Sequence, residues 1–120
     1  MTGPILIAIA CLMGAAGVML AAAGAHSAPG TGLVSASSML LFHAPAVIAT
    51  VLAAGNGMVV RPLGLLAAGG FVVGALLFAG DIAMRAYIGH RLFPMAAPGG
   101  GIILIASWLT LAAAALGNRS

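Results

Sequence analysis

The segment from Gly70 to Gly101 reads GFVVGALLFAGDIAMRAYIGHRLFPMAAPGGG, and it contains both the apolar and the polar features on which the fold depends. A long apolar run leads to Asp81, the only acidic residue of the chain, and Arg85, His90 and Arg91 follow within the next residues. An apolar helix that ends in a few charged residues is typical of a segment that crosses a membrane and reaches its surface. We therefore expect the polar chemistry of this protein where this segment ends.

The composition of the whole chain favours a membrane protein. Of the 120 residues, 63% are hydrophobic and only 4% are charged, and the mean hydropathy is +1.26. A water-soluble domain covers its surface with far more charged side chains. Because a membrane-spanning helix takes about 20 residues, four such helices fit into the chain and leave only short connections. We predict one all-α domain over residues 1–120, an integral membrane four-helix transmembrane bundle.

Breaks rich in glycine and proline divide the chain into four apolar segments. Pro45 lies inside the second segment and predicts a kink or a late helix start, because proline cannot donate to the preceding turn. Pro98 is expected at the first position of the fourth helix. The predicted helices cover about residues 4–25, 36–54, 63–88 and 99–116.

The first segment has an alternative interpretation as a cleaved signal peptide. The small residues between Ala23 and Ala28 resemble a cleavage site. However, no Lys or Arg precedes the apolar run, and the run is long for a signal peptide. We favour a retained first helix.

The charges suggest a lipid bilayer rather than a nucleic acid as the partner. The formal net charge of +3 comes from four scattered arginines that form no basic stripe. Four crossings place both termini on one side, with Arg61 and Arg119, and leave Arg85 and Arg91 on the other. If Asp81 neutralises Arg85, the positive-inside rule favours cytoplasmic termini.

Glycines at helical spacing indicate where the helices pack. Gly70 and Gly74 form a small-xxx-small pair on the face that also carries Asp81. Such pairs let the backbones of membrane helices approach closely. Gly99 and Gly100, at the start of the fourth helix, are further candidate packing residues.

Four ionisable residues form the candidate polar cluster: His26, His43, Asp81 and Arg85. Antiparallel helices would bring them into one half of the membrane. Ionisable residues inside a bundle often mark a proton, ion or ligand site. In the simpler interpretation, Asp81 and Arg85 mark the wet end of a helix, as an exposed pair worth about 0.3–0.5 kcal/mol.

Other chemistries have weaker support. His26, His43 and Asp81 are suitable metal ligands, but no two have ligand spacing within one helix, so we predict no metal site and no cofactor. No nucleophile elbow, phosphate loop or HExxH motif is present, and we expect no enzyme. Cys11 has no intrachain partner for a disulfide and is predicted to be a buried packing residue. Trp108 is likewise interpreted as a packing residue.

Several short motifs occur in a characteristic order along the chain. The end of the first helix resembles a GAFGAH signature, the second helix carries an aromatic-His-Ala element, the third carries an FSG-like element, and the fourth resembles PxGG followed by Gly-Trp. The corresponding residues are Gly24, Ala25 and His26; Phe42, His43 and Ala44; Phe78 to Asp81; and Pro98, Gly99 and Gly100 with Ser107 and Trp108.

In this order and spacing the chain resembles the small bacterial membrane proteins catalogued as domain of unknown function 423, a family similar to vertebrate transmembrane protein 256. The resemblance implies a four-helix protein of a bacterial inner membrane with no established activity. Ala79, Ala97 and Asp81 depart from the family pattern. The departure at Asp81 shifts the functional weight toward His26 and His43.

Two functions are consistent with these observations. The first is a structural or accessory membrane component that self-associates or joins a larger complex, because the chain has 18 glycines and few polar side chains. The second is a small proton or cation transporter or channel that uses His26, His43 and Asp81 as a relay.

Overall fold

The computed structural model describes residues 2–26 and 32–118, and these ranges form four helices without a β-strand. Each helix is long and apolar enough to cross a membrane, as judged by its length and composition. The predicted all-α, four-helix architecture is therefore confirmed. The helices are α1 (Thr2–His26), α2 (Leu33–Gly55), α3 (Arg61–Tyr87) and α4 (Ala96–Gly117).

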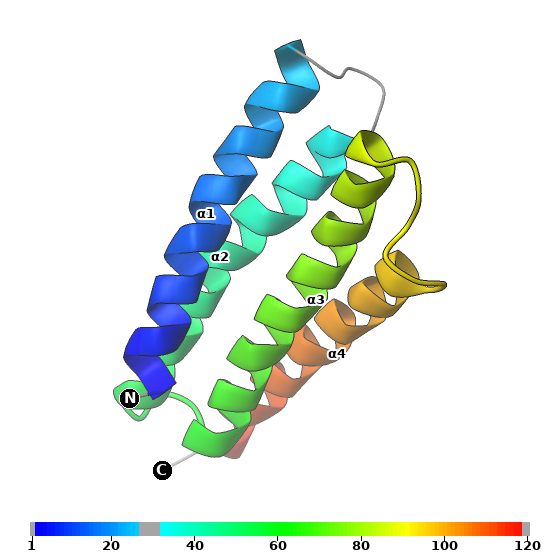
Figure 1. The fold of residues 1–120 in the computed structure, drawn as a ribbon. Coiled ribbons are helices and arrows are strands. Elements are labelled where there is room, and N and C mark those ends of the chain that lie inside the picture. Colours follow the sequence, from blue (N-terminus) through cyan, green and yellow to red (C-terminus); the bar gives the residue numbers. More distant parts are fainter. Residues whose placement is uncertain (1, 27–31, 119–120) are drawn as a thin grey trace.

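The helices pack in the order in which they occur along the chain (Figure 1). α1 packs on α2, α2 on α3, and α3 on α4, which is the arrangement expected of antiparallel neighbours joined by short connections. The inner helices α2 and α3 have 39% and 44% of their apolar windows buried, against 17% for α1 and 22% for α4. The core of the protein therefore lies along α2 and α3.

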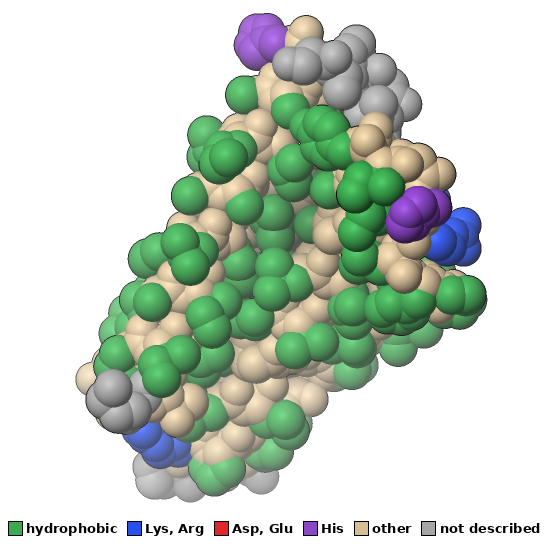
Figure 2. All heavy atoms as spheres, viewed as in Figure 1, with side chains coloured by type: hydrophobic (Ala, Val, Ile, Leu, Met, Phe, Trp, Pro, Cys, Tyr) green, Lys and Arg blue, Asp and Glu red, His purple; other side chains and the backbone are tan. Residues whose placement is uncertain are grey.

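Small residues dominate that core. Ala36, Ala68 and Ala75 are completely buried, and Phe71 is the largest of the fully buried side chains. Small side chains allow close helix contacts, which stabilise membrane proteins through van der Waals packing. Many large apolar residues instead face outward, and Figure 2 shows hydrophobic side chains spread over the visible face. Cys11 is exposed as well, so the prediction that it is buried is wrong. This distribution suits a protein whose solvent is hydrocarbon.

α2 begins earlier than predicted, at Leu33 rather than near Ala36. Leu33 is buried because its side chain packs beside Gly24 of α1, and this contact extends the helix toward the turn. Gly32 supplies the left-handed conformation before it, with φ of 84°. The helix also continues through Pro45, so of the two predicted alternatives, a kink or a late helix start, the late start is wrong.

α3 and α4 likewise begin before their predicted first residues. Pro98 is the third residue of α4 rather than the first, and Pro62 is the second residue of α3. Both positions tolerate proline, because the N–H groups of a first helical turn have no acceptor within the helix. Pro29, Arg119 and the end of the candidate cleavage site, residues 27–28, lie outside the described residues.

Glycines bring α3 and α4 into backbone contact. A Cβ atom on Gly100 would lie 2.7 Å from the carbonyl oxygen of Gly74, and a Cβ on Gly74 would lie 2.9 Å from that of Gly100. A Cβ on Gly70 would collide with the side chain of Ser107. Gly99 differs, since nothing lies within 4 Å of its Cβ position, and its predicted packing role is wrong.

Candidate functional site

Three rings from three helices meet in the core. His43 of α2, Phe71 of α3 and Trp108 of α4 have ring centroids 4.6 to 5.8 Å apart, in tilted arrangements that favour aromatic contact. His43 and Phe71 are buried, whereas Trp108 is 47% exposed. This aromatic cluster links α2 to α4 across α3.

Both ring nitrogens of His43 are occupied. Nδ1 lies 2.7 Å from the carbonyl oxygen of Met39, and Nε2 accepts a hydrogen bond of 3.1 Å from the indole Nε1–H of Trp108. A carbonyl oxygen only accepts and an indole N–H only donates, so the proton of the ring is on Nδ1. The geometry therefore holds His43 as the neutral Nδ1–H tautomer.

A second buried polar group, the carboxylate of Asp81, binds the connection between α3 and α4. Asp81 is buried, and its Oδ1 accepts a hydrogen bond of 2.8 Å from the backbone N–H of Leu92. Its Oδ2 lies 3.3 Å from a guanidinium nitrogen of Arg85, whose side chain is 44% exposed. Gly89, with φ of 94°, provides the turn that returns the chain toward the carboxylate. Asp81 thus holds the connection between α3 and α4 against α3.

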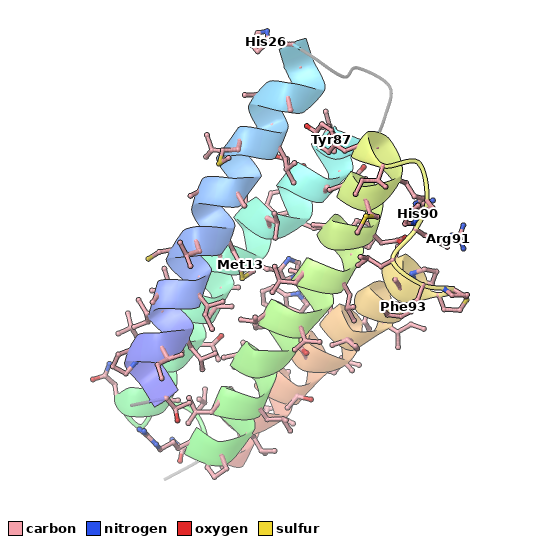
Figure 3. All side chains as sticks on the ribbon, in the orientation of Figure 1. Met13, His26, Tyr87, His90, Arg91 and Phe93 are labelled. Carbon is pink, nitrogen blue, oxygen red and sulfur yellow. The ribbon has the colours of Figure 1, made fainter. Side chains whose placement is uncertain are left out.

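The four predicted site residues do not form one cluster. His26 lies exposed at the end of α1 and points away from the other helices (Figure 3), so its predicted place in the cluster is wrong. Asp81 and Arg85 form the predicted pair. Among the interactions of the described residues, no hydrogen bond or ion pair joins this pair to His43.

Two adjoining hollows accompany the two polar groups. The first, here called the arginine pocket, has a volume of about 340 Å³ and is lined by Phe78, Asp81, Arg85, Arg91, Ala97, Pro98 and Gly101. The second, here called the tryptophan pocket, has a volume of about 280 Å³ and is lined by Met39, His43, Phe78, Gly101, Leu104, Ile105 and Trp108. Phe78 and Gly101 line both hollows.

A larger groove of about 550 Å³ runs between α3 and α4 beside Gly70. Its polar side chains are Ser107 and Thr110, and each hydroxyl donates a hydrogen bond to a carbonyl oxygen one turn earlier in α4. This groove therefore presents apolar side chains and hydroxyls that already have partners.

The chemistry of these sites is limited. Over residues 2–26 and 32–118, no group of three or more His, Cys, Asp and Glu side chains is placed to hold a metal ion. In the same ranges, every buried side-chain nitrogen or oxygen has a hydrogen-bond partner. Two of the buried polar side chains join separate parts of the fold: His43 binds Trp108 of another helix, and Asp81 binds the connection at Leu92. Thr50 and Ser107 instead donate to carbonyl oxygens of their own helices.

Sequence reasoning missed two members of these sites. Trp108 was interpreted as a packing residue, yet its N–H binds an imidazole 65 residues earlier in the chain. The backbone N–H of Leu92 carries no signal in the side-chain pattern, although it binds the carboxylate of Asp81. A buried histidine needs a partner for each ring nitrogen, and the single tryptophan of the chain was the available clue.

Over residues 2–26 and 32–118, the fold is of the class expected for a multi-pass membrane protein: it has four helices long and apolar enough to cross a membrane, and its buried polar side-chain atoms are bonded within the protein. The chain belongs to the family described as Protein of unknown function (DUF423), which matches residues 20–101. The match includes His43 and Asp81 and ends before Trp108. No curated protein and no solved structure matches the chain.

Replacing Trp108 by phenylalanine tests the hydrogen bond to His43. The substitution keeps an aromatic ring against Phe71 but removes the donor to Nε2 of His43, and we expect a loss of about 1 kcal/mol in unfolding free energy. Helicity during denaturation in detergent measures the loss. Trp108→Phe combined with His43→Phe should cost less than the sum of the two single changes, and strict additivity would contradict the proposed bond.

Proposed function

We propose that this protein is a structural or accessory component of a bacterial inner membrane, with both termini in the cytoplasm. It would act by associating with a second copy or with a larger membrane complex, without catalysis. The supporting observation is that each buried polar side-chain atom of the described residues is bonded within the protein. Such polar groups stabilise the folded protein, and none of the buried side-chain donors or acceptors of the described residues is left without a partner.

The same observation argues against a relay as the main function. A histidine that carries protons needs a ring nitrogen that can exchange its partner, but both nitrogens of His43 are already bonded in the core. Both oxygens of Asp81 are also engaged, by the N–H of Leu92 and by Arg85. A relay would have to break these contacts during each transfer.

Flux through reconstituted liposomes distinguishes the two functions. We expect proton and potassium fluxes equal to those of protein-free liposomes, and no change on His43→Ala or Asp81→Asn, because the polar groups are committed to structure. A pH-sensitive dye trapped inside the vesicles reports proton entry. Wild-type flux that either substitution abolishes, in a protein that keeps its helicity, would contradict the accessory role.

Crosslinking in native membranes tests association directly. Cys11 is exposed on α1, and Leu109 is 67% exposed on α4, so single cysteines at these positions sample the two outer helices. The wild type has a single cysteine on α1, at Cys11. The double variant Cys11→Ser, Leu109→Cys has a single cysteine on α4. We expect a thiol crosslinker to give species larger than the monomer from at least one of them. Monomers alone from both would contradict the proposal.

A further inference from the structure

The arginine pocket contains more positive than negative charge. Arg85 and Arg91 both line it, whereas Asp81 is the only acidic residue of the chain and already pairs with Arg85. No acidic side chain therefore remains to neutralise Arg91. A guanidinium group offers five N–H donors in a planar fork that matches the oxygens of a phosphate group. The pocket is thus suited to an anion with several oxygen atoms.

The arginine pocket also lies where the headgroups of a bilayer would be. It is formed at the end of α3 and the start of α4, on either side of their connection. Tyr87 is the last residue of α3 and Phe93 lies within this connection (Figure 3), and they are 60% and 49% exposed. Exposed aromatic residues at the ends of spanning helices are typical of the membrane interface. Lipid phosphates occupy the same level.

The arginine pocket adjoins the tryptophan pocket, whose lining is mostly apolar. Phe78 and Gly101 line both the arginine and the tryptophan pockets. Phe71, which contacts Trp108, precedes Asp81 by ten residues of α3, a rise of about 15 Å. This length is about half of a hydrocarbon core of roughly 30 Å. A molecule that filled both pockets would need an anionic group and an apolar chain of one leaflet's length.

We propose that the two pockets together bind an anionic phospholipid. Its phosphate lies between Arg85 and Arg91, and one acyl chain passes Phe78 and Gly101 to reach Trp108. The apolar half distinguishes this ligand from a soluble phosphate, which would use the arginine pocket alone. The proposal depends on the membrane location of the protein and is independent of the accessory role.

Trp108 reports on the bound chain, because it is the only tryptophan of the protein and lines the tryptophan pocket. The protein is reconstituted into phosphatidylcholine vesicles in which a rising fraction of lipid carries bromine at the middle of one acyl chain. The brominated lipid is either phosphatidylglycerol or phosphatidylcholine. We expect brominated phosphatidylglycerol to reach half-maximal quenching at a mole fraction about fivefold lower than brominated phosphatidylcholine does. A difference of this size corresponds to the attraction between one arginine and an anionic headgroup.

Two matched pairs of variants test which residues cause the preference for phosphatidylglycerol. Arg91→Gln should abolish it, whereas Arg61→Gln, at the other end of α3, should retain it. Gly101→Leu should also abolish it by filling the shared part of the hollow, whereas Gly99→Leu should retain it. Nothing lies within 4 Å of either glycine's Cβ position, so both leucines begin in open space. Helicity measurements verify that each variant is folded.

The outcomes separate a lipid from a soluble anion. Excess inorganic phosphate should leave the preference unchanged. If phosphate abolishes the preference while Gly101→Leu retains it, the site takes a soluble anion and the lipid proposal is overturned. Equal quenching by the two lipids in the wild type, or equal losses in Arg91→Gln and Arg61→Gln, would also overturn it. The quenching of Trp108 is independent of the flux and crosslinking measurements. A negative result for lipid binding therefore leaves the test of the accessory role unaffected.

Discussion

Gly100→Ala is expected to destabilise the protein by about 1–3 kcal/mol, because it forces apart two helices that touch through their backbones. The new methyl group would lie 2.7 Å from the carbonyl oxygen of Gly74 and 2.8 Å from the backbone nitrogen of Phe78. Backbone atoms of a packed helix cannot turn aside as a side chain can, so α3 and α4 must separate. Denaturation of the detergent-solubilised protein, followed by circular dichroism, measures the loss.

The neighbouring glycines provide matched controls for this substitution. Nothing lies within 4 Å of the Cβ positions of Gly99 and Gly101, and alanine is a better helix former than glycine by about 0.5–1 kcal/mol. Gly99→Ala and Gly101→Ala should therefore be neutral or stabilising. If Gly100→Ala is as stable as these two variants, the backbone contact between α3 and α4 is incorrect.

Asp81→Ala is expected to have the second large effect, a loss of about 1–3 kcal/mol. It leaves the N–H of Leu92 without its acceptor and Arg85 without its ion-pair partner. The loss is smaller than for a fully buried pair, because the side chain of Arg85 is 44% exposed and can be solvated. Hydrogen exchange provides a local measurement, since the amide of Leu92 should lose its protection.

Asp81→Asn separates the two interactions of this carboxylate. The amide oxygen has nearly the same shape and can still accept the hydrogen bond from Leu92, whereas the attraction to Arg85 is lost. An exposed ion pair contributes about 0–1 kcal/mol, so Asp81→Asn should be milder than Asp81→Ala. Equal losses in the two variants would show that the ion pair, rather than the bond to Leu92, holds the connection.

Asp81 also shows how far a local pattern reaches. The spacing of Asp81 and Arg85 is enough to predict their pairing, because residues four apart lie on one face of a helix. Whether the pair lies inside or at the surface depended on the connection, which covers the carboxylate and leaves the guanidinium partly exposed. The interpretation as a buried site fits Asp81, and the interpretation as an exposed helix end fits Arg85.

His26 shows the opposite case, in which connectivity was a poor guide to contact. Because neighbouring helices are antiparallel, α1 and α3 end on the same side of the protein, and this predicted that His26 lies near Asp81. However, α1 packs mainly along α2, and its end extends past the other helices (Figure 1). His26 therefore lies exposed and away from His43. Being on the same side of a membrane does not bring side chains within bonding distance.

The sequence by itself determined the number of helices, their approximate positions and their suitability for a bilayer. These properties depend on length and apolar composition, which act locally along the chain. Only the tertiary structure decided which partners the polar groups have: Trp108 for His43, 65 residues away, and the N–H of Leu92 for Asp81. Such partners are decided by how the helices and connections lie in space, and the close approach of α3 to α4 depends on the absence of a side chain at Gly74 and Gly100.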